Sequence, residues 1–170
     1  MEQKITSHFT KGIIIGVVVV TIGFVFQMLD IYDKWVQWIT MGIYFAALIG
    51  SCVFYSQQME GNVTFGNVFS HGFKTAAIVS LISIASFVIS YFALPELKEK
   101  AMEMARLEMA KDERLTQEMI DQAISWTDKF YLAFGIVGSI FAFAFTGAIA
   151  SLIGAAVAKK NPNPQMPQSL

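Results

Sequence analysis

Charged side chains are scarce in this chain and are concentrated in one part of it. Asp, Glu, Lys and Arg make up 15% of its 170 residues, whereas a soluble domain carries about 25%. Of the 12 basic and 13 acidic residues, 15 lie between Glu96 and Lys129, which leaves the rest of the chain almost uncharged. The net charge of −1, with no cluster of five or more basic residues, gives no reason to expect a nucleic-acid partner.

Side chains that carry out catalysis or bind metals are also few. The one cysteine, Cys52, excludes an internal disulfide and a cysteine-based zinc site, and we expect it to be a small packing residue. His8 and His71 are far apart, and neither has a second candidate ligand three or four residues away. The chain has no Gly-rich phosphate loop, nucleophile elbow or paired zinc-ligand spacing. We therefore predict no catalytic, cofactor-binding or metal-binding residues and no enzyme activity.

What the chain does contain is four long apolar runs. They carry no Asp, Glu, Lys, Arg or His, and they cover about residues 13–29, 35–55, 75–94 and 130–158. A hydrocarbon core about 30 Å thick needs about 20 apolar residues of helix to cross it, and a helix satisfies its own backbone in lipid. The predicted fold class is therefore all-α, an integral membrane four-helix bundle in a single domain of residues 1–160. The proline-rich tail, residues 161–170, is predicted to be disordered.

The flanks of the runs support these spans. Trp35, Trp38 and Tyr55, at the two ends of the second run, are typical of membrane–water interfaces. The first run resembles a signal peptide, but no small-x-small cleavage site follows it, so we predict an uncleaved span. Before the third run, residues 64–74 place apolar side chains and glycines on one helical face. This pattern predicts a short interfacial helix capped by Thr64.

The charged segment, residues 95–126, is predicted to be helical and to lie outside the membrane. Pro95 suits the first turn of a helix, and opposite charges three or four residues apart, such as Glu108 and Lys111, favour one. Its apolar positions lack the clean heptads of a coiled coil. Thr116 is a candidate N-cap at which the helix restarts and runs on into the fourth span. We therefore expect a hairpin-like helical excursion between the third and fourth spans.

Basic residues near the spans predict the orientation. One side of the membrane carries Lys4, Lys11, Lys74, Lys159 and Lys160, whereas the short loop on the other side carries Lys34 beside two aspartates. Because Lys and Arg are enriched in cytoplasmic loops, both termini are predicted to be cytoplasmic, in a bacterial inner membrane.

Polar and small side chains inside the runs predict packing contacts. We expect the hydroxyl groups to bond to their own helix backbone or to a neighbouring helix, with a polar path along Ser83, Ser86 and Ser90 as the alternative. Small residues four apart allow helices to approach closely. Such ridges occur at Gly12 and Gly16, at Gly42, Ala46 and Gly50, and at Gly147, Ser151 and Ala155. We predict that they pack within one bundle, with a homodimer contact as the alternative.

The order of these features resembles a bacterial family of small four-span membrane proteins, domain of unknown function number forty-one ninety-nine. The resemblance rests on Thr64-Phe65-Gly66, Gly72-Phe73-Lys74-Thr75, Pro95, Thr116-Gln117-Glu118 and the exit of the fourth span from Leu152-Ile153 to Lys159-Lys160. It covers about residues 8–160. It implies the four-span architecture and no activity, cofactor or site residue.

Two functional hypotheses follow. The first is a non-enzymatic interaction or assembly component of the membrane, because residues 96–126 form the one sizeable polar element and are too charged to be needed for insertion. Beyond the lipid bilayer, its partner is expected to be a membrane protein or another copy of the chain. The alternative is a small transporter, channel or lipid-handling protein that uses the serine row of the third span.

Overall fold

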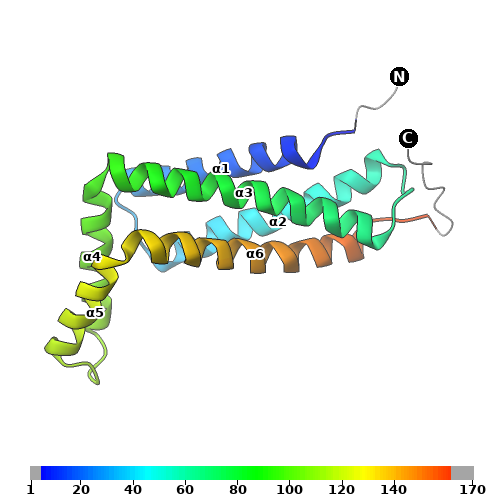
Figure 1. Ribbon diagram of the computed structural model, residues 1–170. Helices are drawn as coiled ribbons and strands as arrows, with labels where there is room; N and C mark the ends of the chain where they lie inside the picture. The colour runs from blue at the N-terminus through cyan, green and yellow to red at the C-terminus, as the bar shows by residue number, and fades with distance from the viewer. Residues whose placement is uncertain (1–4, 162–170) are drawn as a thin grey trace. The chain divides into compact units, whose positions relative to one another are not determined.

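The computed structural model describes residues 5–161, apart from the side chain of residue 34. The described residues form six α-helices and no strand (Figure 1). The helices are α1 (His8–Met28), α2 (Lys34–Gln58), α3 (Phe65–Ala93), α4 (Pro95–Met109), α5 (Gln117–Lys129) and α6 (Tyr131–Val157). The chain divides into two compact units, the first comprising Met1–Ser83 and Phe141–Leu170 and the second Ile84–Ile140. The predicted disordered tail lies, apart from Asn161, outside the described residues.

Four of these helices, α1, α2, α3 and α6, are long and apolar enough to cross a membrane. Many of their large apolar side chains are exposed, among them Leu81 at 64% and Phe145 at 69%. Apolar surface of this extent is unfavourable in water and favourable against lipid. The predicted class, an all-α membrane protein with a helical bundle, is confirmed.

Two helix boundaries differ from the prediction. Residues 64–74 do not form a separate interfacial helix, because α3 runs without a break from Phe65 to Ala93. Thr64 does cap this helix, since its Oγ1 accepts a hydrogen bond from the Asn67 amide at 3.2 Å. The segment after Thr116 does not continue into the fourth span, because α5 ends at Lys129 and Phe130 separates it from α6.

In the first unit, glycines allow helices to approach one another closely. A Cβ atom placed on Gly12 would lie 2.6 Å from Ile78 Cβ on α3, and one on Gly16 would lie 2.8 Å from Ile82 Cδ1. Gly147 of α6 is packed just as closely, 2.6 Å from the Cβ of Ala76 by the same measure. These distances are shorter than any normal carbon–carbon contact, so the small residues are what bring α1 and α6 against α3. The ridges on α1 and α6 therefore pack within the unit, as predicted.

The ridge on α2 behaves differently. Gly42, Ala46 and Gly50 are all exposed, and a Cβ atom on either glycine would meet no described atom within 4 Å. The prediction that this ridge packs within the bundle is wrong for the described chain. The opposite face of α2, with Tyr44 and Leu48, is the one that is buried.

Two apolar clusters form the core of the first unit. One joins α1, α2, α3 and α6 and contains Val19, Tyr44, Leu48, Ala76, Val79 and Ala150. The other surrounds Cys52 and contains Val63, Val68, Ala155 and Ala158. As predicted, Cys52 is a buried packing residue, and it lies against Gly72 and Gly154. The side chain of Tyr44 belongs to the first cluster, and its hydroxyl donates a hydrogen bond to the Phe143 carbonyl oxygen at 3.2 Å.

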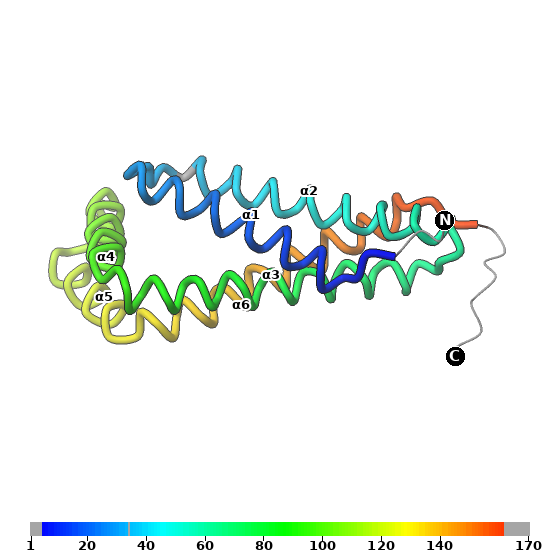
Figure 2. The backbone as a smooth tube through the Cα atoms, turned by 90° about the horizontal axis from the view of Figure 1, so that it is seen from above, coloured from blue at the N-terminus to red at the C-terminus, as the bar shows by residue number. Residues whose placement is uncertain are grey.

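The start of α1, the α2–α3 loop and the end of α6 meet at one end of the first unit (Figure 2). The loop turns through Gly61, whose φ of +78° favours glycine. The Gly61 carbonyl accepts a hydrogen bond from the Asn161 amide at 2.9 Å, and the Asn161 side chain donates to the Glu60 carbonyl at the same distance. On the other side of this end, the Thr6 amide donates to the Gln58 side chain at 3.2 Å.

The second unit consists of the end of α3, the hairpin of α4 and α5, and the start of α6. Aromatic rings connect α3 to α6, because Tyr91 and Tyr131 stack at a centroid distance of 6.1 Å and Phe87 packs over Gly135. Pro95 lies in the first turn of α4, as predicted. In Figure 1, α4 and α5 run antiparallel beside each other, which confirms the expected hairpin.

Candidate functional site

A buried lysine lies near the end of the first unit where the start of α1 and the end of α6 meet. Lys11 belongs to α1, and only 7% of its surface is exposed. Its Nζ lies 3.4 Å from the Ser51 carbonyl oxygen and 3.3 Å from Nε2 of His71, and it is 4.9 Å from the centre of the Phe54 ring. An ammonium group has donors only, so Lys11 donates to the Ser51 carbonyl oxygen, and its Nζ lies within hydrogen-bond distance of the His71 imidazole.

His71 connects this lysine to two further rings. Its imidazole stacks on Tyr55 of α2 at a centroid distance of 4.1 Å, with an angle of 8° between the rings. The His8 ring, from the first turn of α1, lies nearly perpendicular to the His71 ring, at a centroid distance of 6.1 Å. Side chains of α1 and α2 therefore contact His71, which lies on the buried face of α3.

Next to these rings is a polar cavity of about 450 Å³. It is lined by Ile5, Thr6, Ser7, His8, Tyr55, Asn67, Ser70, His71 and Lys74. Among the described residues, the lining thus includes hydroxyl, amide, imidazole and ammonium groups and no carboxylate. We call this cavity and the Lys11–His71 pair beneath it the basic pocket. Its donors and positive charges are suited to an anion.

The sequence did not reveal the basic pocket. It indicated Lys11 as a basic flank of the first span, and it gave His8 and His71 no common site. The structure begins α1 at His8, which places Lys11 inside the bundle, and it brings the two imidazoles together. A signal for His71 was present, because the buried face of α3 repeats at three and four residues. Its members are Val68, His71, Gly72, Thr75, Ala76 and Val79.

Metal binding does not explain the two imidazoles. Within residues 5–161, His, Cys, Asp and Glu side chains form no group of three or more that could hold a metal ion. Two imidazoles beside an ammonium group make a poor cation site, because the positive charge of Lys11 repels the metal.

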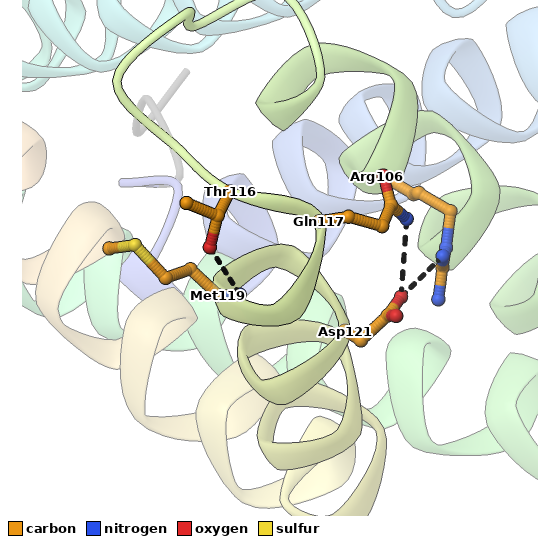
Figure 3. Close-up of polar contacts among 5 residues, drawn as sticks. All are labelled: Arg106, Thr116, Gln117, Met119 and Asp121. Atoms are coloured by element: carbon orange, nitrogen blue, oxygen red, sulfur yellow. Dashed lines mark hydrogen bonds and ion pairs between the residues drawn. The ribbon is translucent and has the colours of Figure 1, made fainter.

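The hairpin of α4 and α5 is held together by ion pairs between its two helices. Lys98 Nζ of α4 lies 2.7 Å from the Asp128 carboxylate of α5, and Arg106 lies 2.6 Å from that of Asp121. The two pairs are eight residues apart on α4 and seven apart on α5, which is the register of an antiparallel pair. Figure 3 shows Arg106 and Gln117 reaching the same Asp121 oxygen. The ion pairs hold the hairpin in one register.

The ends of the hairpin helices follow the sequence prediction closely. The Oγ1 atom of Thr116 accepts a hydrogen bond from the Met119 amide at 3.3 Å and so caps α5 (Figure 3). Glu108 and Lys111 form the expected pair at 2.9 Å. In the loop, Arg114 donates to the Asp112 carboxylate, which lowers the pKa of Asp112. The connection between the helices is therefore ordered by local hydrogen bonds.

Apolar side chains are exposed on the hairpin beside these charges. Leu107 is 59% exposed and Met119 is 51% exposed, and both lie near the tip. Met102 and Ile120, in contrast, are buried. The hairpin therefore uses some of its apolar residues for its own packing and leaves others free for contact with another surface.

Comparison with known proteins gives a family and no function. Searches of the curated proteins and of the solved structures return no match. The family model described as "Protein of unknown function (DUF4199)" matches residues 10–160, which is most of the chain and covers three of the four apolar helices and nearly all of α1. The chain therefore belongs to the DUF4199 family of proteins of unknown function.

Proposed function

We propose that this protein is a non-enzymatic interaction or assembly component of the membrane, and that its α4–α5 hairpin contacts a protein partner outside the bilayer. The observation that carries the proposal is the hairpin itself, in which two ion pairs fix the register while Leu107 and Met119 stay exposed near the tip. A surface that is already rigid loses little conformational entropy when it binds.

Charge favours a protein over the lipid surface as the partner. Residues 96–129 carry nine acidic and six basic side chains. Anionic headgroups repel an acidic segment, so the hairpin gains little by lying on the bilayer. A partner surface with basic groups around an apolar patch would complement both the acidic excess and the exposed Leu107 and Met119.

The proposal includes an orientation, with both termini on the cytoplasmic side of a bacterial inner membrane and the hairpin on the opposite side. Lys74 and Lys159 support it, because both side chains are exposed, Lys74 in the lining of the basic pocket and Lys159 just after the end of α6. Lys11 supports it less than the sequence indicated, because its ammonium group is buried.

Photo-crosslinking in whole cells tests the hairpin contact. A photoreactive residue at position 119 should give a discrete adduct, and Leu107→Ser should reduce its yield at least fivefold by removing a neighbouring apolar contact. Gln122→Ser is the matched control on an exposed position of α5 and should leave the yield unchanged. An adduct of twice the mass of the chain identifies a second copy as the partner. No adduct, or one insensitive to Leu107→Ser, contradicts the proposal.

A second candidate function is a small transporter, channel or lipid-handling protein. One observation favours it: Ser83, in the serine row of α3, has a buried hydroxyl with no hydrogen-bond partner among the described residues. Single cysteines at positions 83, 86 and 90, in a Cys52→Ala background, can be exposed to a membrane-impermeant thiol reagent. Labelling of all three supports a water-filled path, whereas uniform protection contradicts it.

A further inference from the structure

We propose that the basic pocket binds a phosphate group, carried either by a soluble anion or by the headgroup of an anionic lipid. The pocket is distinct from the hairpin, and this inference does not depend on the proposed contact with a protein partner.

The buried ammonium group of Lys11 favours an anion nearby. Its Nζ contacts a carbonyl oxygen, an imidazole and the faces of aromatic rings, and no carboxylate of a described residue is among these contacts. A buried ammonium group without a counter-ion is costly, because its lost hydration is not replaced by an opposite charge. An anion in the cavity, which Lys11 adjoins through His71 and Tyr55, would supply the opposite charge.

The lining of the cavity offers further groups that bind anions. His8 of α1 and Lys74 of α3 add an imidazole and an ammonium group to the lining. The Thr6 hydroxyl already accepts a hydrogen bond from the Gln58 side chain at 3.1 Å, so its own proton is free to be donated. The first turn of α1, which begins at this wall of the cavity, adds the positive end of a helix dipole.

The size and the lining of the cavity also suit a phosphate group. A cavity of about 450 Å³ lies within the range of about 300–1,000 Å³ that small ligands occupy. A phosphate monoester offers three strong acceptor oxygens and close to two negative charges. Donors that line the cavity come from α1, α2 and α3, so they can approach a tetrahedral group from more directions than a planar carboxylate requires.

The location of the pocket is compatible with either source of the phosphate group. The pocket is at an end of the first unit, where the N-terminal part of α1 and the α2–α3 loop lie. If α1, α2, α3 and α6 span the bilayer, that end is at a membrane face, within reach of lipid headgroups and of the aqueous phase.

Binding can be measured on the full chain in nanodiscs of zwitterionic phosphatidylcholine. In the soluble arm, inorganic phosphate and glycerol 3-phosphate are titrated in a calorimeter. In the lipid arm, phosphatidic acid is added to the nanodiscs, and its retention on the protein is measured by native mass spectrometry. A signal in the soluble arm assigns a free anion, and a signal in the lipid arm alone assigns a lipid headgroup.

Three variants distinguish anion binding in the cavity from general attraction to surface charge. Lys74→Gln and His8→Gln each remove one group of the lining, and loss of one charge-assisted contact should weaken binding about tenfold or more. Lys159→Gln is the matched control, because Lys159 is equally an exposed lysine at this end of the unit but does not line the cavity. It should change binding less than about twofold.

Two results would overturn the proposal. One is equal weakening by Lys74→Gln and Lys159→Gln, which would mean that anions are attracted only by the net charge of the surface. The other is the absence of binding in both arms by wild-type protein whose far-UV circular dichroism shows that it is folded.

Discussion

Replacing Gly12 by alanine should force α1 away from α3. The new Cβ would lie 2.6 Å from Ile78 Cβ, 2.8 Å from Ile78 Cγ2 and 3.1 Å from the Thr75 carbonyl oxygen. Carbon atoms pack best at about 3.5–4.0 Å, so α1 must move by about 1 Å. The Ile78 Cβ is attached to the backbone and cannot turn away. Overpacking of this kind costs about 1–3 kcal/mol, and we expect a value near the upper end.

Gly16 provides a graded comparison on the same helix. Its added Cβ would meet Ile82 Cδ1 at 2.8 Å, and this atom is the end of a flexible side chain. Gly16→Ala should therefore cost about 1 kcal/mol. In the double variant Gly16→Ala, Ile82→Ala, the two nearest methyl groups are absent, and the costs of the single variants should not add.

The assay is unfolding in mixed micelles as the mole fraction of SDS is raised, followed by far-UV circular dichroism. Gly42→Ala is the control, because a Cβ there meets no described atom within 4 Å. It should be neutral or stabilise by up to about 1 kcal/mol through helix propensity. If Gly12→Ala and Gly42→Ala unfold at the same SDS fraction, the inferred close packing of α1 on α3 is refuted.

Three further predictions concern single contacts. Thr116→Ala should remove the cap of α5 and destabilise the hairpin by about 0.5–2 kcal/mol, measured as faster amide hydrogen exchange in α5. Tyr44→Phe should cost about 0.5–1.5 kcal/mol in SDS unfolding, because the Phe143 carbonyl loses its hydroxyl donor. The hydrogen bond to Asp128 raises the pKa of Lys98, so this contact stabilises the folded hairpin below about pH 10 and the effect fades as the pH rises through the folded-state pKa. The melting temperature should accordingly be lower for Lys98→Gln than for wild type at pH 8, and the difference should shrink at pH 11.5.

The sequence predicted the spans and the hairpin because both depend on local composition. An uncharged apolar run of about 20 residues has few alternatives to a transmembrane helix, and Pro95 and Thr116 are local signals for the start of a helix. The break at Phe130 was missed because nothing in its residue type interrupts a helix. The continuity of α3 was missed because the apolar side chains and glycines of residues 64–74 were interpreted as the face of a separate interfacial helix. In the structure, Gly72 packs against Cys52 and Ser151.

The basic pocket could not be predicted from one sequence, because it is formed by residues 60 positions apart in the chain. Whether Lys11 lies in a water-exposed flank or inside the bundle depends on where α1 begins, and apolar composition alone does not fix that residue. Which of the small-residue ridges are packed could not be predicted for a similar reason. Gly12 and Gly42 have the same local pattern, but only the arrangement of the helices determines that one is packed and the other exposed.

The central claim, a water-exposed hairpin between lipid-embedded helices, is tested most directly by the labelling of single cysteines in membrane vesicles. Positions 107, 119, 81 and 145 are all more than half exposed in the structure, so the protein itself does not shield any of them. In a Cys52→Ala background, cysteines at 107 and 119 should react quickly with an impermeant maleimide from one side of the membrane. Those at 81 and 145 should react only after detergent is added. Equal labelling of the four positions before detergent would contradict the account.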